Sequence, residues 1–133
     1  MQDGEREVTV RRTGDTQGLA VLYHTVAAAH VDYAATEVLS LILGDAPNGR
    51  LYKALVETKK AAEVFPWSAA LEEPGFLMLG ANLRTEHNLP EAKKILIDTI
   101  ESIAKHPITA EELQRAKAKI DSDIASVFND PEK

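Results

Sequence analysis

VDYAATEVLSLILGDAPNGRLYKALVETK, residues 31–59, is the stretch that decides the fold. Its first part predicts a helix over residues 32–44, because apolar side chains recur there at the i, i+3, i+4, i+7 spacing of a helix packed against a core. Gly44 stands where a left-handed residue ends a helix. After the turn DAPNG, a second, shorter helix is predicted around residues 51–56. We expect this helix pair to lie across one face of a sheet.

Four strands are predicted on either side of the helix pair. Residues 6–12 alternate polar and apolar side chains and are followed, after a turn, by residues 18–27, so the two segments form a predicted hairpin. The second of these strands is apolar on both faces, which is typical of a strand in the middle of a sheet. Residues 62–71 and 75–83 are the third and fourth strands. Pro66 favours an edge or a bulge for the third, because proline cannot donate to a ladder.

Two further helices close the sequence, and each is opened by a capping box. Asn88 with Glu91 forms the first box and Thr109 with Glu112 the second. Apolar residues at helical spacing follow, and in the last helix they are Leu113, Ala116, Ile120, Ile124 and Val127. The order of strands and helices predicts an α+β fold of two layers, with a mostly antiparallel sheet of four or more strands and helices packed on one face.

Length and composition describe a single module. The chain has 133 residues, of which 44% are hydrophobic and 27% are charged, as in a globular domain. A formal net charge of −6, with no basic stripe, argues against nucleic-acid binding. The lack of cysteine excludes thiolate zinc sites and disulfides. No apolar run reaches the ~18–20 residues that cross a bilayer, so no membrane partner is expected.

Neither end of the sequence has the features of a natural terminus. MQDGEREV lacks the basic start and the apolar stretch of a signal peptide. The last predicted helix is stopped only by Pro131, two residues before the sequence ends. We therefore interpret residues 1–133 as one α/β module excised from a larger protein, with residues 1–5 as a linker.

Motifs that carry chemistry are missing from the sequence. His24, His30, His87 and His106 have no second histidine three or four residues away, so neither HExxH nor HxxEH occurs. No serine lies in a G-x-S-x-G elbow, and the turn 44–49 lacks the Gly-Lys-Ser/Thr end of a phosphate loop. We therefore predict no catalytic residue, no metal-ligating residue and no cofactor held by this chain. No substrate-binding residue can be named.

Aromatic and basic residues receive ordinary structural interpretations. Tyr23, Phe65 and Trp67 are predicted to be core residues, because aromatic side chains at such spacing most often fill a core. Arg50 and Lys53 are predicted to be exposed helix residues that need no functional role.

Three phrases of the sequence resemble a known family. They are ILGDAPNGRLYKALVETKKAA (residues 42–62), TVRRTGDTQGLAVLYHTVAAAHVDYAA (9–35) and ALEEPGFLMLGANL (70–83). They resemble the insulinase/pitrilysin family of zinc metallopeptidases, which are similar to the mitochondrial processing peptidase. More narrowly, the chain resembles the second, non-catalytic α/β module of the zinc-bearing half of a bacterial member. The resemblance covers nearly the whole chain, and residues 44–59 are its most specific part.

The resemblance implies that the zinc site lies on another module. In this family the first module of the catalytic half carries HxxEH and a later Glu, and no residue here matches those positions. The opposite half supplies an Arg and a Tyr that hold the substrate, six residues apart after the first helix pair. Glu57 and Val64 occupy the equivalent positions here. This departure is the reason for placing the chain in the zinc-bearing half.

The role implied by the resemblance is architectural. The module forms part of a chamber wall around a peptide substrate and packs on the catalytic module, while zinc belongs to the parent protein. The alternative is a module of a degenerate, non-proteolytic member that serves as a scaffold or partner subunit. A free-standing ligand-binding domain is disfavoured by the incomplete ends. The expected partners are the remaining modules of the parent and, through the parent, peptide substrates.

Excision from a larger protein also has a physical consequence. The apolar surface that faced the neighbouring modules is left exposed, and this predicts self-association of the chain through that surface or through an unpaired sheet edge. Bacterial relatives with this pattern are often exported, so the resemblance implies that the parent lies in the periplasm.

Overall fold

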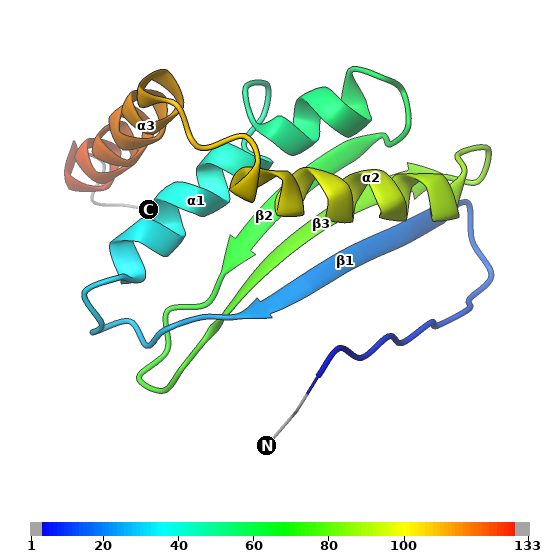
Figure 1. The fold of residues 1–133 in the computed structure, drawn as a ribbon, viewed down its shortest axis with the longest axis horizontal. Coiled ribbons are helices and arrows are strands. Elements are labelled where there is room, and N and C mark those ends of the chain that lie inside the picture. The colour runs from blue at the N-terminus through cyan, green and yellow to red at the C-terminus, as the bar shows by residue number, and fades with distance from the viewer. Residues whose placement is uncertain (1–3, 130–133) are drawn as a thin grey trace.

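A computed structural model describes residues 4–129 of the chain. The elements are β1 (Thr16–His24), α1 (Tyr33–Gly44), the π-helical turn η1 (Tyr52–Val56), β2 (Glu63–Ser68), β3 (Phe76–Arg84), α2 (Leu89–Glu101), the 3₁₀ turn η2 (Ser102–Ala104) and α3 (Ala110–Asn129). The helices gather on one side of the strands (Figure 1). The predicted α+β class is confirmed.

The sheet has three strands in the order β1-β3-β2, and both pairings are antiparallel. Leu79 of the central strand is paired with Val21 on one side and with Pro66 on the other. The prediction of four or more strands is therefore wrong for the described residues. The predicted edge position of Pro66 is confirmed, because β2 is an edge strand. Proline, which lacks a backbone N–H, is tolerated in such a strand.

Residues 6–12 account for the missing strand. They form no ladder within the described residues, and Val8 and Val10 are both exposed. Two valines among charged neighbours bury too little apolar surface to offset the entropy of ordering a hairpin. The segment is instead tied to α2 by an ion pair, with Lys93 Nζ 2.8 Å from Glu7 Oε1. In Figure 1 this segment runs away from the start of β1 without pairing with a strand.

β1 lies at an edge of the sheet and not in its middle. Leu19 and Val21 face the helices and are half-buried, whereas Ala20 and Leu22 on the opposite face are exposed. The apolar pattern on both faces therefore does not mark a central strand here. One of its two faces is an uncovered surface of the molecule.

β3 is the central strand and carries the core. Its helix-facing residues Leu77, Leu79, Ala81 and Leu83 are all at most 4% exposed. The largest fully buried side chains of the molecule are Leu43, Leu51, Leu55, Leu79, Leu83 and Leu96. They come from α1, the second short helix, β3 and α2, so the core lies between the sheet and these helices.

Gly44 has a different role from the one predicted. It ends α1 without a left-handed backbone, and a Cβ built on it lies 2.7 Å from the Cβ of Pro66. Glycine is therefore needed because α1 and β2 approach closely at this point. The left-handed residue is Lys59, with φ of 61°, which follows η1.

The predicted capping box at Thr109 forms with both of its hydrogen bonds, and the one at Asn88 forms with one. The backbone amide of Glu91 donates to Asn88 Oδ1 at 3.0 Å. The amide of Glu112 donates to Thr109 Oγ1 at 3.2 Å, and the amide of Thr109 donates to Glu112 Oε2 at 2.9 Å. α3 then packs on α1 and not on the sheet.

Candidate functional surfaces

Arg50, in the helical turn that leads into η1, anchors the start of α3 to that segment. Its Nε donates to Glu112 Oε1 at 2.7 Å and its Nη2 to Glu112 Oε2 at 2.8 Å. The same guanidinium donates to the carbonyl oxygens of His106 and Pro107. Only 16% of the Arg50 side chain and 19% of the Glu112 side chain are exposed. The interpretation of Arg50 as an ordinary exposed residue is therefore wrong.

The same contacts set the charge state of Glu112. Hydrogen bonds from the Arg50 guanidinium, opposed by burial and aided by the Thr109 amide, lower the pKa of Glu112 from 4.5 to about 2. A bidentate pair of this kind favours the carboxylate strongly. Glu112 is therefore ionised at neutral pH, and its ion pair with Arg50 forms a junction between the start of α3 and the segment before η1.

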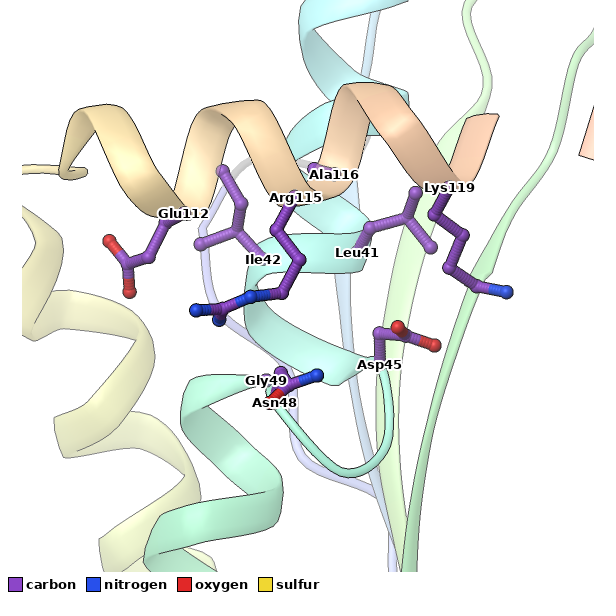
Figure 2. A pocket seen from close by; sticks show the side chains of 9 residues that line it. All are labelled: Leu41, Ile42, Asp45, Asn48, Gly49, Glu112, Arg115, Ala116 and Lys119. Carbon is purple, nitrogen blue, oxygen red and sulfur yellow. The ribbon is translucent and has the colours of Figure 1, made fainter. Parts of the chain in front are cut away.

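A pocket of about 180 Å³ lies beside this junction, between α1, α3 and the turn that joins α1 to the second short helix. Figure 2 shows Arg115 and Lys119 extending from α3 over the turn that carries Asp45 and Asn48. Arg115 Nη2 lies 2.9 Å from Glu111 Oε1, and Lys119 Nζ lies 3.6 Å from Asp123 Oδ2. The basic groups of the pocket are thus already paired, and its lining contains no nucleophile and base in contact.

The histidines are dispersed over the fold. His24 ends β1, His30 lies in the loop before α1, His87 follows β3, and His106 follows η2. The Nδ1 atoms of His30 and His87 each accept a hydrogen bond from a backbone amide. Within residues 4–129 no three His, Asp or Glu side chains group as ligands for a metal ion. The zinc that the resemblance implies therefore does not fit these residues. No helix in that range is long and apolar enough to span a bilayer.

The sheet face that carries no helix is rich in apolar side chains. We define the open face as Leu22, Phe65, Trp67, Phe76 and Met78, which alternate with the core-facing positions of the three strands. Leu22 is 59% exposed and Trp67 is 56% exposed. The rings of Trp67 and Phe76 meet edge to face, with centroids 5.1 Å apart.

Gly80, on the central strand, leaves room on the open face for the ring of Phe65. The ring of Phe65 lies over Gly80, where an added Cβ would collide with it. The prediction that Trp67 is a core residue is wrong, since half of its side chain lies in solvent. An exposed apolar surface of this kind is characteristic of a site of protein contact.

A second cavity, of about 230 Å³, opens between α1, α2 and the sheet. Its apolar lining consists of Leu39, Leu43, Leu77, Leu79, Ile100 and Ile103. Tyr23 stands at its rim, and burial together with the nearby carboxylates of Glu101 and Glu5 raises the pKa of this tyrosine. The hydroxyl of Thr25, also in the lining, is buried and has no partner within the described residues.

Comparison with known proteins places the chain in a family. Residues 1–120 match the sequence profile described as the peptidase M16 inactive domain. A crystal structure of an inactive peptidase domain from Bordetella parapertussis is 40% identical, with a TM-score of 0.82, and the match covers 95% of this chain and 69% of that one. A Helicobacter pylori protease structure, at 24% identity and a TM-score of 0.79, shares the fold over 88% of this chain and 29% of its own.

A curated relative shows how much of a longer protein the chain corresponds to. The zinc protease PqqE of Helicobacter pylori is 27% identical over 127 residues, which are 94% of this chain and 29% of that protein. The chain thus spans less than a third of the length of that relative. Profile, sequence and fold agree that the chain belongs to the insulinase-like peptidase M16 family and represents its inactive, non-catalytic domain.

Proposed function

We propose that this chain is a non-catalytic structural module of a longer zinc-dependent protease, called the parent below. The module packs on the catalytic module and forms part of the wall of a chamber around a peptide substrate. The family assignment and the zinc protease among its relatives support this proposal. The scattered histidines support it as well, because zinc needs about three protein ligands converging on one point.

The open face is the observation that carries the proposal. A sheet normally buries an apolar face against another layer, and here one layer is absent. Leu22 and Trp67 stand in solvent next to Phe65, Phe76 and Met78, with no helix over them. A neighbouring module of the parent that covers this face removes the cost of exposing it.

The test compares the effect of Leu22→Asp on the unfolding midpoint of the isolated chain and of the parent. Leu22→Asp costs little in the isolated chain, because that side chain is mostly exposed, but in the parent it places a charge in a buried contact between modules. We expect an unfolding midpoint that is nearly unchanged in the isolated chain and clearly lower in the parent. Val31→Asp, at an exposed loop position, is the control and leaves both midpoints unchanged. Equal effects of Leu22→Asp in both settings contradict the proposal.

Measurements of bound zinc and of proteolysis test the proposal that the catalytic site lies on another module of the parent. The parent is expected to bind one zinc ion and to cleave an unstructured peptide in a reaction that a chelator stops, whereas the isolated 133 residues do neither. Stoichiometric zinc on the isolated chain contradicts the proposal. A parent without zinc or proteolysis identifies instead the scaffold or partner-subunit alternative.

A further inference from the structure

α3 is covered along only part of its length. Ala116, in its first half, is packed on α1 and is 5% exposed. Beyond that point the exposure of the apolar residues rises, to 51% at Ile124, 65% at Val127 and 82% at Phe128. Figure 1 shows α3 at the periphery of the molecule, away from the sheet. An amphipathic helix with such residues in solvent lacks a partner on that side.

The exposed residues belong to one apolar stripe of the helix, whose central residue, Ile120, is half-buried. At 100° per residue, Leu113, Ile120, Ile124 and Val127 fall within about 60° of arc, next to the side that α1 covers. Leu113 and Val127 lie at equal separations before and after Ile120. The stripe is therefore nearly palindromic about Ile120. Two copies of it match when the helices run antiparallel, with Leu113 facing Val127 of the partner subunit.

The charges along the stripe favour the same arrangement. Glu111 and Glu112 are paired with Arg115 and Arg50, and Lys119 is paired with Asp123. Within residues 4–129, Lys117 and Asp121 form no ion pair, and helical geometry puts both on the flank away from α1.

In a two-fold antiparallel pair, like flanks face each other. Lys117 of each copy then faces Asp121 of the partner subunit, twice. A parallel two-fold pair sets opposite flanks against each other instead, so Lys117 does not meet Asp121 of the partner subunit. The flank charges therefore select the antiparallel orientation.

We propose that the distal face of α3, defined as Leu113, Ile120, Ile124, Val127 and Phe128, binds a second copy of this chain. The two α3 helices cross antiparallel, with Ile120 at the two-fold axis and two Lys117–Asp121 contacts on the flank. An isologous contact of this kind closes on itself and gives a dimer, not a filament. The inference does not depend on the proposed function, because it concerns only residues of α3.

Sedimentation equilibrium of the 133-residue chain measures the association directly. The dimer dissociation constant is expected to rise about a hundredfold in Ile124→Asp and Val127→Asp, because each substitution buries an unpaired charge in the contact. Both positions are exposed in the monomer, so the variants fold, which circular dichroism checks. Val31→Asp, an equally exposed apolar position outside α3, leaves the constant unchanged.

Charge exchange tests the orientation. Lys117→Glu and Asp121→Lys each weaken the dimer by about tenfold, and the double variant restores it, because every contact is then reversed and remade. Since the chain contains no cysteine, Ile120→Cys gives a covalent dimer on oxidation, whereas Ala118→Cys on the outer side of the helix does not.

Two results overturn the inference. The first is a chain that stays monomeric at every concentration tested. The second is an association that is lost in Leu22→Asp but kept in Val127→Asp, which assigns self-association to the open face of the sheet. Neither result involves zinc or the parent, so failure here is distinguishable from failure of the proposed function.

Discussion

Arg50 and Glu112 show what a single pair of residues does in this fold. They lie 62 residues apart in sequence, yet two hydrogen bonds join their side chains. No local pattern connects them, so sequence reasoning missed the pair. The capping box at Thr109 and Glu112 was predictable because it depends on four consecutive residues. The same glutamate thus has a local role that the sequence predicts and a long-range role that it does not.

The pair makes stability depend on pH in a defined window. The folded pKa of Glu112, about 2, lies below the ordinary value of 4.5, so its stabilising contribution is complete above pH 4.5 and is lost as the pH falls toward 2. We expect the difference in free energy of unfolding between wild type and Glu112→Gln to shrink by about 3 kcal/mol across that window. Urea denaturation at several pH values measures it. A difference independent of pH contradicts the assignment.

Gly44 gives a second prediction at the residue scale. Alanine normally stabilises a helix relative to glycine by about 1 kcal/mol, but here its Cβ meets Pro66. We expect Gly44→Ala to lower the free energy of unfolding by about 1–3 kcal/mol through overpacking. Gly18→Ala is the matched control, because a Cβ there meets no atom within 4 Å. Equal effects of the two substitutions in chemical denaturation rule out this role for Gly44.

At the scale of elements, periodicity predicted the helices and three of the four expected strands, because each of these buries one regular face. It failed where burial depends on distant neighbours. Residues 6–12 have the alternation of a strand but no layer to cover their valines, and β1 has two apolar faces of which only one is covered. α3 likewise continues its apolar stripe beyond the part that α1 covers. Whether an apolar face is buried depends on the whole assembly, and one sequence does not specify it.

Two residues on adjacent strands, pointing to opposite faces of the sheet, test which face is buried. Leu79, on the helix side of β3, is fully buried, whereas Leu22, on the open face of β1, is mostly exposed. We expect Leu79→Ala to lower the free energy of unfolding by about 2–5 kcal/mol and Leu22→Ala by well under about 1 kcal/mol in the isolated chain. Guanidinium denaturation measures both. A large loss in Leu22→Ala indicates that the open face is covered even without the parent.

At the scale of the whole molecule, the chain is a two-layer sandwich of which one outer face is apolar. Sequence reasoning assigned the family from residues spread over the chain, and the profile match confirms it. It could not locate the open face, because Trp67 and Phe65 have the same apolar character whether they lie in a core or on an exposed sheet. Only the three-strand arrangement shows which side of the sheet is uncovered.

Hydroxyl-radical footprinting of Trp67 and Met78 in the isolated chain and in the parent tests the account most directly. Trp67 is the only tryptophan of the chain and, at 56% exposed, is one of the two most exposed residues of the open face, so its oxidation reports on that face. The account predicts rapid oxidation of both residues in the isolated chain and strong protection in the parent, with Val31 equally reactive in the two. Equal oxidation of Trp67 in both settings would contradict the claim that another module packs on this face.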